Sequence, residues 1–323
     1  MSARHDAFRL GDQEQRDGAF ERQESRFRQW VTADGASGFE PQAGRYHLYV
    51  CRACPWAHRA LIGIELMGLR EAITVSYVDP IRDGRGWAFT TPGCYEDPVN
   101  GFKLLAEAYL SVDPGFSQRV TVPVLWDRER ATIVNNESSE ILRMLHTVFA
   151  PLAQHPVQLY PAAHAAEIDA LNSLIYDNVN NGVYRAGFAT GQQAYERAVL
   201  ELFAVLDELD GRLAQRRFLF GVQPLETDWR LFTTLVRFDA VYQIHFKCSI
   251  RKLSEYRHLW PYLRDLYQWP GIRETVSFTE IRDHYYRTHP GLNPHGLVAV
   301  MPALDFDAPH GRESLGAGAP TQR

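Results

Sequence analysis

The chain has 323 residues, of which 45% are hydrophobic and 23% are charged, and its formal net charge is −5. This composition is typical of a globular protein with one large domain or two ordinary ones, and no basic stripe is present to bind nucleic acid. No apolar run approaches the ~20 residues that span a bilayer, and the first residues lack the apolar core of a signal peptide, so we expect a cytoplasmic protein without membrane contact.

The first third of the chain predicts an arm followed by a βαβ unit. Residues 1–40 are polar with isolated aromatic side chains, and we expect an irregular arm across the domain surface. The pattern then changes to a strand at 46–50, a helix at 55–67 that Gly68 stops, and a second strand at 73–78.

A long connection separates this unit from the next strands. Residues 79–116 contain a helical piece near 103–110, and a loop of this length in a compact domain is often functional. Residues 122–126 and 131–134 then predict a β-hairpin, and a helix follows from about 137 to 149.

The order β-α-β, connection, β-β-α is that of the thioredoxin fold. It predicts a thioredoxin-like domain over 41–150. Only helical patterns follow, which predict an all-helical domain over 160–305, so the fold class is α/β plus all-α. A flexible tail is expected over 306–323, because these residues are rich in Gly, Ala and Pro. The helices expected in the second domain cover about 163–181, 192–215, 228–246 and 257–268.

Cys54 is followed directly by proline, which is favoured at the first position of a helix because its missing N–H would have no partner there. The thiol is thus expected where a strand passes into a helix. Free N–H groups and the helix dipole stabilise a thiolate at such a place, where the pKa of a cysteine can fall from about 8.5 to between about 3.5 and 7.5. The alternative is a small buried hydrophobe, which we expect for Cys94 and Cys248.

Pro123 lies where the thioredoxin fold places a cis proline beside its reactive thiol. Proline is poorly tolerated within a sheet except at an edge or a strand start. We therefore predict a cis Val122–Pro123 peptide. The alternative is a trans proline that opens an edge strand.

Six separated motifs, in order, resemble those of the glutathionyl-hydroquinone reductases, the Xi class of the glutathione transferase superfamily, and the resemblance covers about residues 40–305. They are Tyr49-Val-Cys-Arg-Ala-Cys-Pro-Trp-Ala-His-Arg-Ala, Asp97-Pro-Val-Asn-Gly-Phe-Lys, Arg119-Val-Thr-Val-Pro-Val-Leu-Trp-Asp, Asn180-Asn-Gly-Val-Tyr-Arg-Ala-Gly-Phe-Ala, Asp228-Trp-Arg-Leu-Phe and His284-Tyr-Tyr.

The resemblance implies that Cys54 attacks the sulfur of a glutathionyl-hydroquinone and forms a disulfide with glutathione, which a second glutathione then reduces. The site is monothiol, because Ala57 holds the position of a resolving cysteine. Cys51 stands where relatives usually carry serine; it is either inert or forms a reversible disulfide with Cys54. No second Cys or His pair completes a zinc site, so no metal is expected. The resemblance implies glutathione as the co-substrate.

The resemblance also assigns the glutathione site. Glu137 and Ser138 would bind the γ-glutamyl end, although they can equally form a plain helix cap. Val122 would offer its backbone to the cysteinyl part. Arg119 would neutralise a carboxylate, and Trp87 would complete the pocket unless it is only a surface anchor for its loop.

For the hydroquinone, the resemblance points to three tyrosines, each able to contact a ring and to hydrogen-bond its oxygen: Tyr184, Tyr242 and Tyr285. Tyr286 is an alternative to Tyr285, and His284 is a weaker acid/base candidate. A homodimer is expected by analogy. The competing functions are a conjugating glutathione transferase and a non-catalytic protein that binds quinones or partners.

One departure from the family pattern lies at the start of the helix that contains Asp228. Leu225 stands three residues before Asp228, where relatives usually show serine or threonine. We expect the helix cap to be weakened by about 1 kcal/mol, with no effect on the chemistry.

Overall fold

The computed structural model describes residues 15–316, so the predictions for 1–14 and 317–323 lie outside the described residues. The described chain forms two compact units. The first unit contains residues 23–157 and 277–288, and the second contains 15–22, 158–276 and 289–316.

A four-stranded mixed sheet forms the centre of the first unit, in the order β4-β3-β5-β6. β3 (Tyr46–Val50) pairs in parallel with β4 (Ile73–Tyr77) and antiparallel with β5 (Val124–Asp127). β5 and β6 (Thr132–Asn135) form the predicted hairpin. All five residues of β3 are buried, as expected for a central strand with both faces covered.

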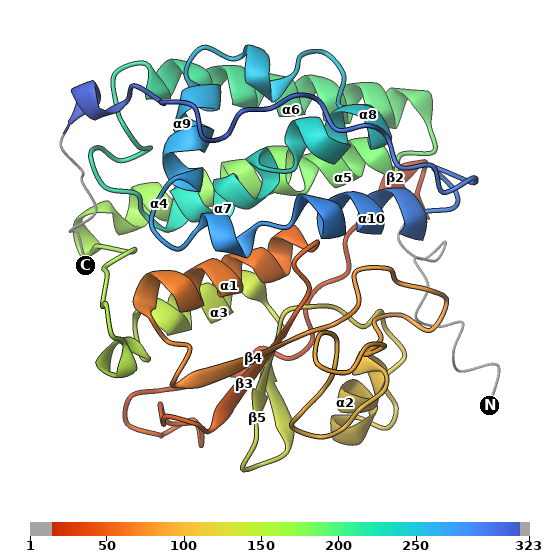
Figure 1. The fold of residues 1–323 in the computed structure, drawn as a ribbon, viewed down its shortest axis with the longest axis vertical. Helices are drawn as coiled ribbons and strands as arrows, with labels where there is room; N and C mark the ends of the chain where they lie inside the picture. The colour runs from red at the N-terminus through yellow and green to blue at the C-terminus, as the bar shows by residue number, and fades with distance from the viewer. Residues whose placement is uncertain (1–14, 317–323) are drawn as a thin grey trace. The chain divides into compact units, whose positions relative to one another are not determined.

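The helices of the first unit cover the sheet as the thioredoxin fold requires. α1 (Pro55–Met67) and α3 (Ser138–His146) pack side by side, while α2 (Leu105–Val112) packs near β6 on the other side of the sheet (Figure 1). α1 ends at Gly68, whose φ of +63° is strained for any other residue type. The predicted fold of this half of the chain is confirmed.

One buried carboxylate orders the long connection between β4 and β5. Asp97 accepts hydrogen bonds from the Tyr49 hydroxyl (2.9 Å) and from the backbone N–H groups of Val99 (3.0 Å) and Phe102 (3.1 Å). Since Tyr49 belongs to β3, this carboxylate ties the loop to the central strand. The motif that begins at Asp97 therefore has a structural role.

The second unit is helical apart from a short hairpin of β1 (Gln15–Arg16) and β2 (Ala19–Phe20). Its α-helices are α4 (Ala165–Ile175), α5 (Gly182–Gly187), α6 (Gln192–Leu213), α7 (Glu226–Leu235), α8 (Gln243–His245) and α9 (Leu259–Tyr267). Two of the predicted helices are interrupted by π-helical turns, at Tyr176–Asn180 and Phe238–Tyr242. Its short 3₁₀ turns lie at Ala162–His164, Leu253–Glu255, Arg273–Thr275 and Glu313–Leu315, and the first unit has one at Ala150–Leu152.

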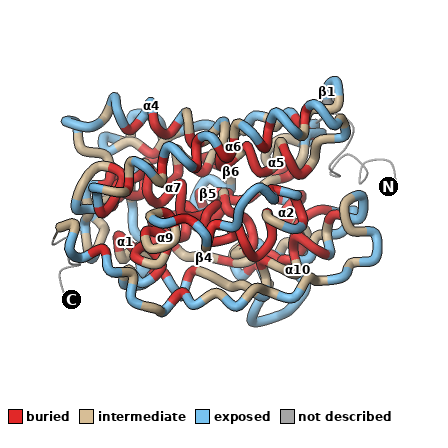
Figure 2. Tube along the Cα trace, turned by 90° about the horizontal axis from the view of Figure 1, so that it is seen from above, coloured by how far each residue is buried: buried red, intermediate tan, exposed pale blue. Residues whose placement is uncertain are grey.

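The start of α7 lies at Leu225, where the sequence predicts a weakened cap. Leu225 is the N-cap residue and makes no side-chain hydrogen bond to the helix. Asp228 compensates in part, because one of its oxygens accepts the Leu225 N–H at 2.8 Å. The Leu225 side chain is itself buried, and α7 is buried along most of its length (Figure 2).

One helix was missed by sequence reading. α10 (Phe278–Thr288) follows the last predicted helix, at 257–268, and it belongs to the first unit. Its buried positions are Ile281, His284, Tyr285 and Tyr286. Three of these four side chains carry polar groups, so the apolar helical period is weak.

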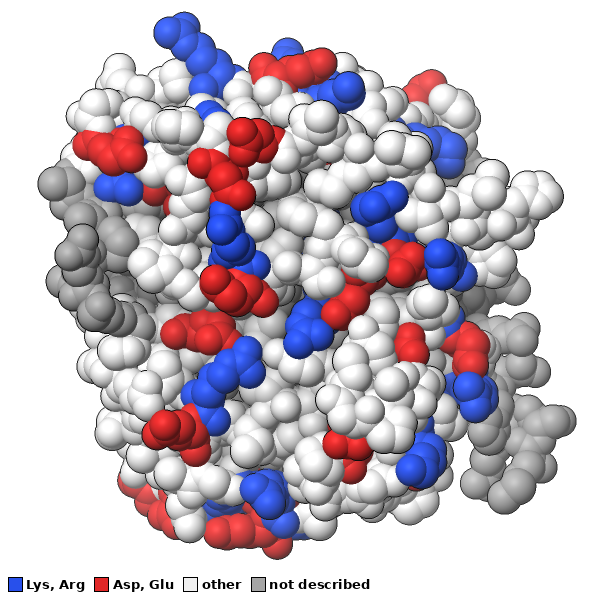
Figure 3. Space-filling view, in the orientation of Figure 1, with Lys and Arg blue, Asp and Glu red and all other residues white. Residues whose placement is uncertain are grey.

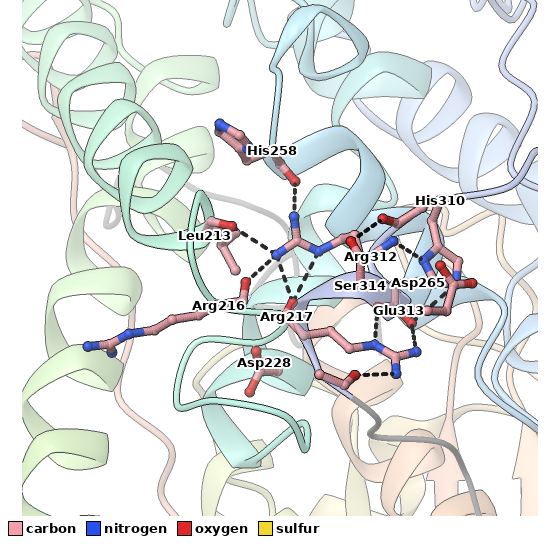
Figure 4. A network of polar contacts seen from close by, with 12 residues as sticks. Leu213, Arg216, Arg217, Asp228, His258, Asp265, His310, Arg312, Glu313 and Ser314 are labelled. Atoms are coloured by element: carbon pink, nitrogen blue, oxygen red, sulfur yellow. Dashed lines mark hydrogen bonds and ion pairs between the residues drawn. The ribbon is translucent and has the colours of Figure 1, made fainter.

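The flexible tail expected over 306–323 is wrong for residues 306–316. Phe306 is buried, and its ring lies 4.9 Å from that of Tyr267 and 5.2 Å from that of Trp260. Arg312 is buried beyond the end of α6, where its guanidinium donates to the backbone carbonyls of Leu213, Arg216, Arg217 and His258 (Figure 4).

Next to this guanidinium, a buried ion pair joins Arg217 to Asp265 through two hydrogen bonds of 2.8 and 2.9 Å. Composition alone predicted a flexible tail. The buried side chains of Phe306 and Arg312 are enough to anchor residues 306–316.

Charges of both signs are interspersed on the face shown in Figure 3. Exposed ion pairs such as Arg251–Asp207 (3.1 Å) are of the kind that contributes little to stability. Across residues 15–316, no helix combines the length and apolar character that a bilayer span requires.

Candidate active site

Cys54 lies where the sequence predicts, between the end of β3 and the start of α1. It is the N-cap residue of α1, in extended conformation, with Pro55 at the first helical position. Its carbonyl accepts the His58 N–H at 3.0 Å, which starts the helix. The sulfur atom is therefore beside the positive end of the α1 dipole, which favours negative charge.

The Val122–Pro123 peptide is cis, as predicted. The Cys54 Sγ lies 3.7 Å from the Val122 carbonyl oxygen, so the thiol and the residue before the cis proline are in contact. Cys54 is 8% exposed. The first unit thus brings together two sequence features that lie 68 residues apart.

Cys51 is joined to Cys54 by a tight turn, in which the Cys54 N–H donates to the Cys51 carbonyl at 3.1 Å. Burial raises the pKa of the Cys51 thiol, and the neighbouring Cys54 raises it further. Neither cysteine forms a disulfide bond. A thiol that stays protonated is a poor nucleophile, which favours the inert alternative for Cys51.

Glu137 and Ser138 form the start of α3, so the cap expected from the sequence exists. Glu137 accepts hydrogen bonds from the Ser139 N–H (3.1 Å), the Ser139 hydroxyl (2.9 Å) and the Ser25 hydroxyl (2.9 Å). Burial acts to raise the pKa of Glu137, but these hydrogen bonds and the Arg59 charge lower it below its usual range. Ser138 is buried, 3.4 Å from an Arg59 nitrogen.

A pH-dependent stability follows from this carboxylate. Its folded-state pKa is depressed, so its contribution is present above the ordinary value of 4.5 and is lost as the pH falls. We expect Glu137→Gln to lower the free energy of unfolding by about 1 kcal/mol at pH 7 and by less at pH 4. Urea titrations at both pH values measure this, with Glu129→Gln at an exposed position as control. An equal loss at both pH values would contradict the role of the charge.

Trp87 is buried rather than a surface anchor. Its indole stacks on the imidazole of His284, with the ring centroids 5.2 Å apart and the planes at 16°. Arg119 is half-buried, and its backbone is held by Gln23, which accepts the Arg119 N–H at 2.9 Å and donates to its carbonyl at 3.1 Å.

The three predicted tyrosines are divided between the two units. Tyr285 is on α10 in the first unit and is buried. Tyr184 and Tyr242 belong to the second unit, where their ring centroids lie 6.2 Å apart. Tyr184 is half-buried, whereas Tyr242 is fully buried and stacks on Phe246 at 5.5 Å.

Sequence reading missed a cation beside Tyr184. The guanidinium carbon of Arg22 lies 4.6 Å from the Tyr184 ring centroid, and its Nε donates to the Asn181 side chain at 2.7 Å. Arg22 belongs to the arm, in which no periodic pattern singles out one arginine. Among residues 15–316, no group of three His, Cys, Asp or Glu side chains is arranged to hold a metal.

Known proteins resemble the chain along most of its length. The family model "Glutathione S-transferase, N-terminal domain" matches residues 53–148, and "Glutathione S-transferase, C-terminal domain" matches 192–265. Glutathionyl-hydroquinone reductase YqjG of Escherichia coli is 51% identical over 92% of this chain and 93% of its own. Glutathionyl-hydroquinone reductase PcpF of Sphingobium chlorophenolicum is 45% identical over 88% and 90%.

Solved structures agree with these relatives. The Xi class transferase of Natrialba magadii is 53% identical, with a TM-score of 0.87 and 89% of each chain covered. The glutathione-bound structure of YqjG also has a TM-score of 0.87, covering 89% of this chain and 96% of that one. The chain therefore belongs to the glutathionyl-hydroquinone reductases, the Xi class of the glutathione transferase superfamily.

Proposed function

We propose that the chain reduces glutathionyl-hydroquinones to hydroquinones, with glutathione as the reductant and Cys54 as the nucleophile. The observation that carries this proposal is the Cys54 thiol at the start of α1, in contact with the residue before a cis proline. Conjugating transferases generally place a serine or tyrosine hydroxyl near glutathione. A thiol at this place favours disulfide chemistry instead.

The reaction has two sulfur transfers. The Cys54 thiolate attacks the glutathione sulfur of the substrate, a disulfide bond forms, and the bond between that sulfur and the aromatic carbon breaks. The electron pair passes to the ring, which takes a proton and leaves as the hydroquinone. The thiolate of a second glutathione then attacks the glutathione sulfur of the mixed disulfide, so that Cys54 leaves as thiolate and oxidised glutathione is released.

We assign the γ-glutamyl end of glutathione to Glu137 and Ser138. A carboxylate has about four acceptor sites. The Glu137 carboxylate accepts three hydrogen bonds from serines, which leaves an acceptor site for an ammonium group. Ser138 offers a hydroxyl at the start of α3, where the helix dipole favours a carboxylate.

Three further residues complete the proposed glutathione site: Trp87, Arg119 and Val122. We assign the hydroquinone ring to Tyr184, Tyr242 and Tyr285, whose phenols can contact the ring and donate a proton to it. A homodimer in the cytoplasm is also part of this proposal, by analogy with the family.

The test uses the whole chain and glutathionyl-menadiol without added glutathione. We expect one equivalent of menadiol to be released and glutathione to be found on the peptide that contains Cys54 by mass spectrometry. Added glutathione should then restore the free thiol and yield oxidised glutathione. Absence of menadiol, or an adduct on another cysteine, would contradict the proposal, and formation of a conjugate from menadione would favour a transferase.

A further inference from the structure

α10 belongs to the first unit, although residues 158–276, which separate it in sequence from the rest of that unit, belong to the second. Glu280 and His284 are four residues apart on this helix, so their side chains lie on the same face. Each makes a contact with a segment of the proposed glutathione and thiol site.

The first contact lies at the turn that carries the thiol. A Glu280 carboxylate oxygen lies 2.9 Å from an Arg52 nitrogen, and Arg52 is located between Cys51 and Cys54. The side chains of Glu280 and Arg52 are 12% and 28% exposed, so the pair is only partly screened by solvent. Arg52 also has a second contact, because its guanidinium carbon lies 3.7 Å from the Tyr77 ring centroid.

The second contact lies at the loop that carries Trp87. The Nδ1 atom of His284 is 2.6 Å from the Pro80 carbonyl oxygen. A carbonyl only accepts, so Nδ1 is the protonated nitrogen and the ring orientation is fixed. The same imidazole stacks on Trp87. His284 is thus engaged in holding the helix.

Tyr285 follows His284 directly, and the two rings meet edge to face, with centroids 5.3 Å apart and planes at 84°. We propose that Glu280 and His284 are positioning residues, which fix Tyr285 relative to the Cys54 turn and so set the reactivity toward aromatic substrates. This inference rests on the proposed function, in which Tyr285 contacts the hydroquinone. A displacement of about 1 Å at a reacting group can reduce a rate by about 10²-fold. Loss of the Glu280 and His284 contacts, which we together call the clamp, should therefore change the rate measurably.

The test compares two substrates for each variant. Glutathionyl-menadiol needs Tyr285, whereas the mixed disulfide of glutathione and 2-mercaptoethanol needs only Cys54 and glutathione. For Glu280→Ala we expect kcat/KM to fall by about tenfold on glutathionyl-menadiol and by less than about twofold on the disulfide. Arg52→Ala and the double variant complete a double-mutant cycle, in which the two losses should not add.

Asp283→Asn is the matched control. Asp283 is on the same helix and pairs with Arg287 at 3.3 Å on a more exposed face, so its loss should leave both substrates unaffected. Equal losses on the two substrates in Glu280→Ala, or no loss on either, would overturn the clamp, as would full additivity with Arg52→Ala.

Hydrogen exchange tests the clamp without any substrate. In Glu280→Ala we expect the amides of α10 to exchange faster, while those of α1 keep their protection. Unchanged exchange in α10 would refute the clamp even if the enzyme proved inactive on hydroquinones. The two proposals can fail separately. If the wild-type chain released no menadiol, the proposed function would be wrong. Faster exchange of α10 in Glu280→Ala would then still show that Glu280 holds the helix, but its effect on reactivity would be refuted.

Discussion

Replacing Cys54 by serine will abolish release of hydroquinone, with a loss in kcat on the order of 10³-fold or more, as found when a covalent nucleophile is removed. Serine keeps the shape of the side chain and is itself a favoured N-cap residue. The hydroxyl is not ionised at neutral pH and does not attack sulfur, so no mixed disulfide forms. The measurement is menadiol released from glutathionyl-menadiol with glutathione in excess.

Cys51→Ser is the control for this prediction, because the two cysteines lie at the ends of one turn. Burial raises the pKa of Cys51, so it should contribute no thiolate, and the variant should keep activity within about threefold of wild type. A large loss in Cys51→Ser would show that the pair works as a dithiol. Retained activity in Cys54→Ser would remove the proposed mechanism.

The largest effect on stability is expected at Asp228, which is fully buried at the start of α7. Its carboxylate accepts the N–H groups of Leu219 (2.9 Å) and Leu225 (2.8 Å) and the hydroxyl of Tyr262 (2.8 Å). Asp228→Ala leaves three buried donors without an acceptor. Since each can cost about 1–3 kcal/mol, we expect the free energy of unfolding to fall by at least about 3 kcal/mol.

Two milder variants should show smaller losses in the free energy of unfolding. In Asp228→Asn the amide nitrogen must face at least one of the two backbone N–H groups, so the variant should lose about 1–3 kcal/mol. Tyr262→Phe removes one donor and its bond, and should lose about 1 kcal/mol. Urea titrations measure the free energy of unfolding of the three variants. If Asp228→Ala lost no more of it than Tyr262→Phe, the proposed role of the Asp228 carboxylate would be contradicted.

The pH dependence at Asp228 has the opposite sign to that at Glu137. Burial raises the pKa of Asp228 to about 6, above its ordinary value of 3.8. The folded state therefore binds the proton more readily, and the contribution of this group to stability grows as the pH falls from about 6 toward 3.8. The difference in unfolding free energy between wild type and Asp228→Ala should be larger at pH 5 than at pH 7.5.

Sequence reading succeeded where signals are local. The run β3-α1-β4 was predicted because Pro55 and Gly68 mark the ends of α1 and because apolar residues define the strands. One feature that is not local was also predicted. The cis peptide at Pro123 was expected because the thioredoxin fold places a cis proline there.

Sequence reading failed where a structure depends on polar contacts between distant residues. Arg52 and Glu280 are 228 positions apart, and Arg312 and Arg217 are 95 apart, so neither contact leaves a periodic pattern. The two π-helical turns were also missed, because they disturb the helical period by one residue over a single turn. The roles of the site residues were supplied by the family resemblance, since the chain alone does not tell one tyrosine from another.

The place of α10 has a consequence for how the protein is made. The first unit is completed only by residues 277–288, which leave the ribosome after all of residues 158–276. Until then, Trp87 lacks the imidazole that stacks on it and Arg52 lacks its carboxylate partner. The thiol of Cys54 is thus synthesised before residues 158–276, but its final surroundings are assembled only after them.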